Sequence, residues 1–179
     1  MAAMDPSSWV EQQLVPTMLA RGSFGNKSSH REESRKCNVT QTDTGDDHFT
    51  SNIIFINLEL KFEHQATQAY SLLVKVTSED PIYRTCLDTD ILFHNEIHMY
   101  TEVIPIVEEF LRKRKIDLLG EIFAKCYYAD CGAACVGGRG IIVLEDMVPR
   151  RFTPAVERLF LDYEHCAVAL RQLARYHAV

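Results

Sequence analysis

Hydrophobic and polar positions follow the pattern of β-strands in four segments of the chain. Two apolar segments rich in β-branched residues, SNIIFINLELKFEH from Ser51 and QAYSLLVKV from Gln68, are separated by a few polar residues. Such a pair is expected to form antiparallel neighbours. Further along, EIFAKCYYA and GRGIIVLEDM are also typical of strands, and the glycine-rich stretch between them is expected to be a turn.

Between the two pairs of strands, apolar residues recur at intervals of three and four, which is the spacing of one helix face. This segment runs from Thr89 to Lys115, and Asp88 or Thr89 is expected to cap its start. The face residues are Phe93, Glu96, Ile97, Tyr100, Val103 and Ile104. Glu96 is therefore expected to point at the core.

The end of the chain is also predicted to be helical, from Thr153 and Pro154 and then through LDYEHCAVALRQLARYHAV. One face of the last helix carries Cys166, Ala169, Leu170, Leu173 and His177. His177 is expected to be a packed core histidine and not a catalytic base. Because this apolar face needs a partner and has no Gly or Asn cap, we expect the natural domain to continue beyond Val179.

The first 44 residues are expected to form a helix and a flexible connector. Ser8 and Glu11 have the spacing of a capping box, which predicts a helix that begins there. Its apolar side carries Val10, Leu14, Met18 and Leu19, with Pro16 in the middle. From Arg21 to about Asp47 the chain is polar and has little apolar surface to bury, so organised structure is expected to restart at Phe49.

The formal net charge of -6 narrows the range of partners. Binding to nucleic acid or to an anionic membrane depends on an excess of Lys and Arg, so we expect neither, and small molecules or proteins are the expected partners. The N-terminus lacks the pattern of a secretory signal, and nowhere do about 18 apolar residues run together. These features predict a cytoplasmic protein whose six cysteines are reduced.

Cys126, Cys131 and Cys135 come nearest to a metal-binding pattern. Their spacing lacks a CxxC clamp and no His follows closely, so we expect no metal site. A cysteine-based zinc domain is an alternative that a zinc assay of the purified protein would test.

Alternation along the second strand places a lysine on the face opposite to most of the apolar residues of the strand. Lys75 and Leu73 share one face, and the other face carries Leu72, Val74 and Val76. A lysine in an apolar strand and a glutamate on an apolar helix face are each costly alone. If the helix packs on the sheet, Glu96 is expected to pair with Lys75.

The order of these features resembles the small lobe of a protein-kinase-like fold. More narrowly, LLVKV, FHNEIHMYTEVIP, KCYYA, IIVLEDM and LRQLARYHA are similar to the ecdysteroid-kinase-like (CHK kinase-like) family, which is related to aminoglycoside and choline kinases. The similarity runs from about Gly45 to the end. It implies an α+β fold, with 45–147 as a small lobe that has an antiparallel sheet and one packed helix, and 148–179 as the start of a truncated helical large lobe. Residues 1–44 precede it as the N-terminal helix and flexible connector.

The resemblance also implies which residues bind ATP. Lys75, paired with Glu96, would hold the α- and β-phosphates. IIVLEDM would be the hinge between two lobes, in which Leu144 closes the back of the adenine pocket. The Glu145 carbonyl would accept a hydrogen bond from the adenine amino group, and the Met147 amide would donate one to the ring.

Two neighbouring features follow from the same resemblance. The phosphate-covering turn is expected from Gly45 to Ser51, with one glycine where protein kinases have GxGxxG. The adjacent carboxylates of Glu145 and Asp146 would face solvent or cap the next segment. A plain acidic turn after a strand is the alternative.

Family members carry, in their large lobe, an HGD-type loop whose Asp accepts the substrate hydroxyl proton, and a later Asp that binds Mg²⁺. Neither is found in the 179 residues, so we expect no catalytic residue here and no transfer by this chain alone. The resemblance thus predicts the ATP-binding portion of a small-molecule kinase that phosphorylates a hydroxyl of an ecdysteroid-like or other small alcohol. The alternative is a non-catalytic binding or regulatory module.

Overall fold

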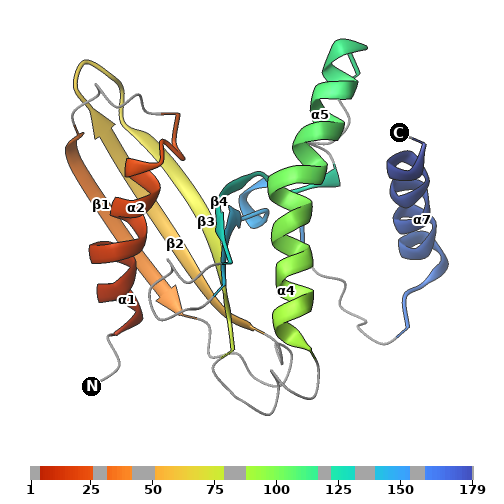
Figure 1. Ribbon diagram of the computed structural model, residues 1–179, viewed down its shortest axis with the longest axis horizontal. Coiled ribbons are helices and arrows are strands. Elements are labelled where there is room, and N and C mark those ends of the chain that lie inside the picture. Colours follow the sequence, from red (N-terminus) through yellow and green to blue (C-terminus); the bar gives the residue numbers. More distant parts are fainter. Residues whose placement is uncertain are drawn as a thin grey trace.

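Strands from both halves of the chain form a five-stranded antiparallel sheet in the order β1-β2-β3-β5-β4 (Figure 1). The computed structural model describes residues 5–25, 32–41, 51–78, 88–116, 122–131, 140–153 and 160–178. The strands are β1 (Glu32–Gln41), β2 (Ser51–Phe62), β3 (Gln68–Thr77), β4 (Cys126–Asp130) and β5 (Ile141–Glu145). The predicted α+β class and the predicted pairing of β2 with β3 are confirmed.

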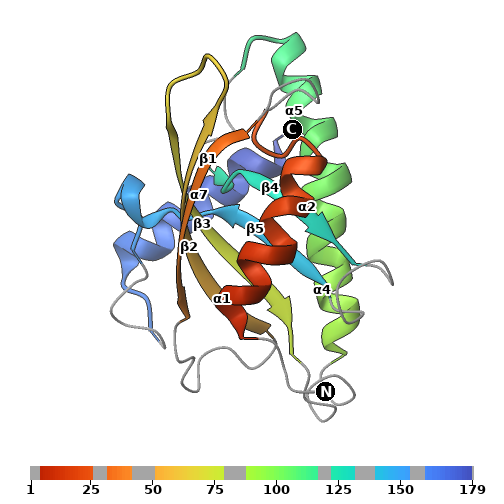
Figure 2. The same ribbon diagram turned by 90° about the vertical axis from the view of Figure 1, so that its left-hand side faces the viewer.

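Helices lie on both sides of the sheet (Figure 2). The N-terminal helix consists of α1 (Pro6–Trp9), a π-helical turn (Val10–Leu14) and α2 (Val15–Ala20). The second helix lies beside β4 and β5 and consists of α4 (Thr89–His98), a π-helical turn (Met99–Val103) and α5 (Ile104–Lys113). After β5 come a 3₁₀ helix (Val148–Arg150) and α7 (Tyr163–His177).

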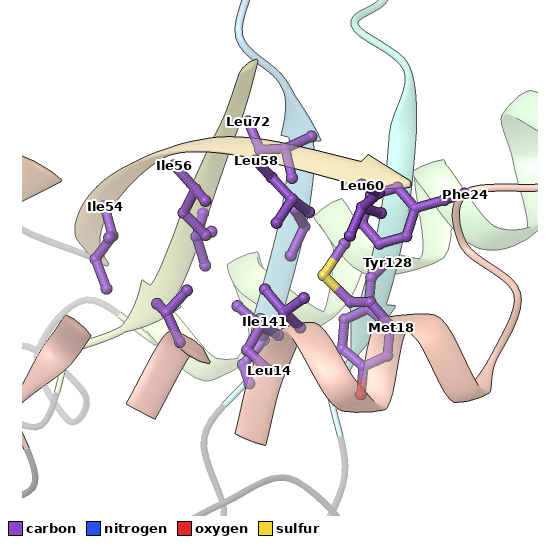
Figure 3. Packing of buried hydrophobic residues seen from close by; sticks show 14 of the residues in the cluster. Leu14, Met18, Phe24, Ile54, Ile56, Leu58, Leu60, Leu72, Tyr128 and Ile141 are labelled. Atoms are coloured by element: carbon purple, nitrogen blue, oxygen red, sulfur yellow. The ribbon is translucent and has the colours of Figure 1, made fainter. Parts of the chain in front are cut away.

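The largest apolar cluster fills the space between the N-terminal helix and one face of the sheet (Figure 3). Alternate residues of β2 point into it, and those buried most deeply are Ile56, Leu58 and Leu60. The helix contributes Val10, Val15 and Met18, which are fully buried. Burial of this many aliphatic side chains is the main stabilising term of the fold.

The N-terminal helix begins earlier than the capping-box pattern predicts. Its N-cap is Asp5, whose carboxylate accepts a hydrogen bond from the Ser8 amide at 3.2 Å, and Pro6 takes the first helical position. Ser8 is therefore inside the helix, and the predicted Ser8–Glu11 box is wrong. A proline has no amide hydrogen to satisfy at this position, which makes it a favourable first residue.

The predicted flexible connector is wrong for ten of its residues, because Glu32–Gln41 form the edge strand β1 along β2. Cys37 and Val39 pack against the main cluster. The charged residues of β1 form ion pairs, including Lys36 Nζ to Glu59 Oε2 at 3.4 Å. Charged side chains are common on exposed edge strands, and because of them β1 lacks the apolar pattern by which strands are predicted from sequence.

The division of the chain at residues 44 and 147 stays a prediction.

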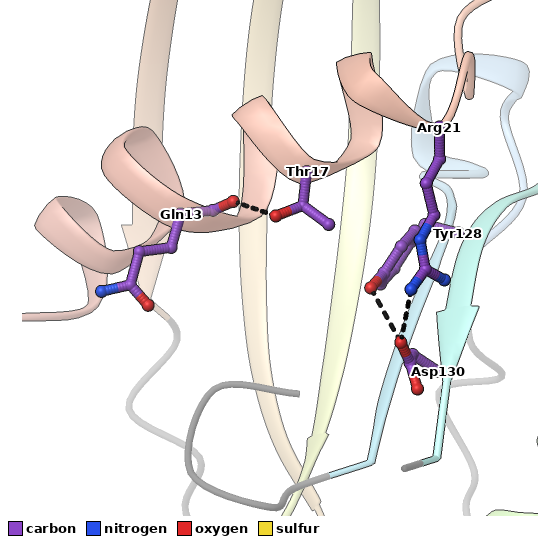
Figure 4. A network of polar contacts seen from close by, with 5 residues as sticks. All are labelled: Gln13, Thr17, Arg21, Tyr128 and Asp130. Atoms are coloured by element: carbon purple, nitrogen blue, oxygen red, sulfur yellow. Dashed lines mark hydrogen bonds and ion pairs between the residues drawn. The ribbon is translucent and has the colours of Figure 1, made fainter. Parts of the chain in front are cut away.

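A polar contact ties the end of the N-terminal helix to β4 (Figure 4). The Arg21 guanidinium lies 3.1 Å from Asp130 Oδ2 and packs over the Tyr128 ring. The Tyr128 hydroxyl donates to the same carboxylate at 3.2 Å. The helix is thus fixed to the far edge of the sheet as well as to its centre.

Both π-helical turns end two residues before a proline. The Val15 amide donates to the Val10 carbonyl before Pro16, and the Ile104 amide donates to the Met99 carbonyl before Pro105. A proline lacks the amide needed for an α-helical bond and crowds the preceding turn. The wider turn lets each helix continue through its proline.

The last predicted helix is present as α7, and its N-cap Asp162 accepts from the His165 amide at 2.8 Å. Its predicted apolar face is exposed; Leu170, for example, is 65% accessible. His177 is also exposed, so the prediction of a packed core histidine is wrong. Within the described residues, the Tyr176 ring does contact the Phe123 ring, with centroids 5.6 Å apart. The helical start predicted at Pro154 falls outside the described residues.

Candidate functional site

An ion pair joins the sheet to the second helix at the predicted position. The Lys75 ammonium nitrogen on β3 lies 2.8 Å from Glu96 Oε1 and 2.6 Å from Glu96 Oε2 on α4. In the sheet, Lys75 stands between Ile53 of β2 and Ile142 of β5. The prediction that Glu96 pairs with Lys75 is confirmed.

The ion pair is only partly shielded from water. The Lys75 side chain is 25% accessible and the Glu96 side chain is 32% accessible. A pair this exposed stabilises a fold by about 1 kcal/mol or less. Its contribution to stability is therefore small, and its main effect is to hold an ammonium group at a fixed place on the sheet.

An apolar row crosses the sheet beside Lys75. Phe55 of β2, Leu73 of β3 and Leu144 of β5 are paired in register, and alternation places them on the same face as Lys75. Phe55 and Leu73 are half-buried, whereas Leu144 is buried. A flat apolar group could stack on this row with an anionic group against the ammonium. The sequence analysis missed Phe55, although its alternation with the buried residues of β2 could have identified it.

The segment after β5 leaves the sheet through defined backbone contacts. The Glu145 amide donates to the Lys125 carbonyl at 2.8 Å, and the Asp146 amide donates to the Ser71 carbonyl at 2.9 Å. The next residue is Met147, whose carbonyl accepts from the Arg150 amide at 3.1 Å. No described residue accepts a hydrogen bond from the Met147 amide.

The two acidic side chains at the end of β5 have partners. Asp146 Oδ1 accepts from the Val148 amide at 3.0 Å, at the start of the 3₁₀ helix. The Glu145 carboxylate lies 3.2 Å from the Arg150 guanidinium. The expectation that these carboxylates face outward or cap the next segment is confirmed for Asp146, whereas Glu145 is compensated by its ion pair with Arg150.

The predicted phosphate-covering turn is described only at its end. Gly45 lies outside the described residues. Ser51 opens β2 opposite Thr77, and both side chains are almost fully buried. A part for Ser51 in phosphate binding stays a prediction.

Two cavities lined by described residues flank the helix that carries Glu96, and neither is lined by Lys75. One, of about 440 Å³, lies between Tyr100 on the helix and Glu145 at the end of β5. Burial raises the pKa of Tyr100 to about 12, with a smaller contribution from the negative charge of Glu96. Burial likewise raises the pKa of Cys126, which also lines this cavity, to about 11. Both groups are protonated near neutral pH, so neither supplies a base or a nucleophile.

The other cavity, of about 410 Å³, is lined by several groups that can bind protons or metals. His94 Nδ1 lies 3.0 Å from Cys131 Sγ, and His98 lies 3.3 Å from Glu102. Among the described residues, no three His, Cys, Asp or Glu side chains are placed to hold a metal ion. Cys135, the third cysteine of the weak zinc pattern, lies outside them.

The sheet order, the lysine–glutamate pair and the strand that runs into a connecting segment define the small lobe of a protein-kinase-like fold. The chain belongs to the ecdysteroid kinase-like family, whose model matches residues 45–179. Membership implies a kinase-like phosphotransferase that uses ATP and acts on small molecules. The match begins after α1, α2 and β1.

No curated protein and no solved structure matches the chain. None of the described helices is long and apolar enough to cross a membrane.

Proposed function

We propose that this chain is the ATP-binding portion of a kinase that transfers the γ-phosphate to a hydroxyl of an ecdysteroid-like or other small alcohol. The observation that carries the proposal is the Lys75–Glu96 pair beside the half-buried row of Phe55 and Leu73. A fixed ammonium next to a flat apolar surface suits a ligand that has an aromatic base at one end and phosphates at the other.

Each part of the nucleotide has a proposed partner. Lys75 binds the α- and β-phosphates while Glu96 keeps its side chain in place. The adenine ring lies on the apolar row against Leu144, accepts a hydrogen bond from the Met147 amide and donates one to the Glu145 carbonyl. The turn from Gly45 to Ser51 covers the phosphates.

Phosphoryl transfer needs more than these residues. A carboxylate must orient the acceptor hydroxyl, and Mg²⁺ must offset the charge of the phosphates. Among the described residues, no cluster of acidic or other metal-binding side chains is placed for this. We propose that the chain as given binds ATP without transferring its phosphate, at a cytoplasmic location.

A second candidate is a non-catalytic binding or regulatory module with the same small lobe. It would use the same Lys75–Glu96 pair without a transfer step. Like the first candidate, it predicts no phosphorylated product when the acceptor alcohol is added to a mixture of the chain and ATP. It also predicts that a protein partner, and not the acceptor, changes ATP affinity.

Calorimetric titration of the chain with ATP tests the first proposal. Lys75→Met should weaken ATP binding about tenfold to a hundredfold, because a hydrogen bond to a charged group is lost. Lys61→Met is the matched control, since Lys61 pairs with Glu33 at the far end of β2. Equal affinities for the two variants, or no binding of ATP by the unaltered chain, would sink the proposal.

A further inference from the structure

The glycine that precedes β5 is fixed against β3. The Thr77 amide donates to the Gly140 carbonyl at 3.1 Å, and the Gly140 amide donates to Thr77 Oγ1 at 3.2 Å. The amide and the carbonyl of Gly140 are thus both hydrogen-bonded to Thr77. The glycine therefore cannot move away from a neighbour without breaking a contact with β3.

The ring of Phe93, from α4, lies directly against this glycine. A Cβ atom on Gly140 would stand 2.7 Å from Phe93 Cδ1 and 2.8 Å from Cε1. Carbon atoms normally stay about 3.5–4.0 Å apart. Phe93 is 5% accessible and packs against Ile97, Ile142 and Leu144, so its ring has little room to turn away. Only a residue without a side chain permits this approach.

The same helix turn carries the partner of Lys75. Glu96 follows Phe93 by three residues and so shares its helix face. On the strand, Lys75 precedes Thr77 by two residues and so shares its sheet face. The contacts thus run in a closed path from Lys75 through Glu96, Phe93 and Gly140 to Thr77 and back along β3.

We propose that Gly140 is a positioning residue: its missing side chain lets Phe93 bring α4 to the distance at which the Glu96 carboxylate reaches Lys75. A methyl group there pushes α4 away from β3 and separates the ion pair. Only the consequence for nucleotide binding rests on the proposed function, because the contact itself is a property of the fold.

A double-mutant cycle on unfolding by urea measures the ion pair without nucleotide. Lys75→Met, Glu96→Gln and the double variant should reveal a coupling of about twofold to fivefold in the unfolding equilibrium constant. In a Gly140→Ala background the coupling should vanish. It should return in Gly140→Ala combined with Phe93→Leu, which removes the ring atoms at 2.7 and 2.8 Å and leaves the looser contact of the new methyl with Thr77 Cγ2 at 3.2 Å.

Gly25→Ala is the control for a general loss of stability. Gly25 has a φ of 72°, so alanine is strained there, but its Cβ would meet nothing within 4 Å. This variant should unfold more easily and keep the full coupling. Coupling that survives in Gly140→Ala overturns the inference. If Gly140→Ala does not fold, the combined variant decides: restored coupling supports the inference, and failure to fold or to restore coupling overturns it.

Titration with ATP then separates the two proposals. Gly140→Ala should lose affinity as Glu96→Gln does, and Phe93→Leu should restore it. If the unaltered chain binds no ATP while the coupling still depends on Gly140, the proposed function fails and the positioning inference stands. If ATP binds normally and the coupling ignores Gly140, only the inference fails.

Discussion

The two faces of the sheet differ in how completely they are covered. The N-terminal helix closes one face, where Leu72, Val74 and the alternate residues of β2 are buried. Among the described residues, α4 covers the other face over β5 and its neighbours, and Phe55, Leu73 and Lys75 stay half-exposed. The closed face supplies most of the stability of the fold, while the open face keeps charge and apolar surface available to a ligand.

The largest expected difference between the faces is in stability. Leu72 and Leu73 are adjacent on β3 and point to opposite faces. Leu72→Ala should lower the free energy of unfolding by about 2–5 kcal/mol, because it leaves a cavity in a closed core. Leu73→Ala should cost about 1 kcal/mol, because water can fill the space, but it should weaken ATP binding.

Urea denaturation of both variants, followed by ATP titration, checks this pair. The comparison fails if the two substitutions cost the same stability, or if Leu72→Ala changes ATP affinity more than Leu73→Ala does.

Thiol reactivity should distinguish cysteines that are covered by a helix from cysteines that are exposed. Burial raises the pKa of Cys37, beside the closed face, and of Cys126, beneath the second helix, from 9.0 to about 11. At about pH 8, each should carry about a hundredfold less thiolate than an unshifted thiol. Mass spectrometry after iodoacetamide treatment should therefore find Cys131 and Cys166, both exposed, modified before Cys37 and Cys126. Equal modification of Cys126 and Cys131 would contradict this.

The same thiols make stability depend on pH. Their pKa values are higher in the folded chain than the ordinary 9.0, so folding favours the protonated form. This contribution is present below pH 9.0 and is lost as pH rises through about 11. The urea midpoint should fall over that range, and it should fall less in a variant with Cys37→Ala and Cys126→Ala. An unchanged pH profile in that variant would show that these thiols are not shielded.

A smaller effect is expected at the start of the N-terminal helix. Asp5→Ala should lower the free energy of unfolding by about 1 kcal/mol, because the Ser8 amide loses its acceptor. Ser8→Ala is the matched control and should change stability by a few tenths at most, since only its backbone takes part in the cap. A larger loss of unfolding free energy in Ser8→Ala would show that the Ser8 side chain caps the helix, as the capping-box pattern predicts.

Regular patterns made much of this fold predictable. Strict alternation along β3 put Lys75 on the opposite face from Val74, and helical spacing put Glu96 on the buried side of its helix. The pairing of Lys75 with Glu96 therefore followed from the strand period and the helix period. Strand β1 was missed because it is an edge strand whose Lys36 pairs with Glu59 instead of packing. The helix start was missed because the pattern of Ser8 and Glu11 outweighed the signal of a proline at the first position.

Features that depend on contacts between distant segments could not be predicted. Gly140 looks like one more glycine of a turn until Phe93 is seen against it. The exposure of His177 depends on what packs against α7, and helical spacing says nothing about that. Periodicity predicts the face of the helix or strand on which a residue lies. Whether another element packs on that face depends on the tertiary structure.

Magnetic resonance of the isotope-labelled chain during addition of ATP tests the central claim most directly. The account predicts shifted signals for the Met147 amide and for the side chains of Phe55 and Leu73, and unshifted signals for Leu72 and Met18 in the core between the N-terminal helix and the sheet. Lys75→Met should reduce these shifts at equal ATP concentration. Shifts that gather on the N-terminal helix, or no shifts at all, would contradict the assignment of the open face to ATP.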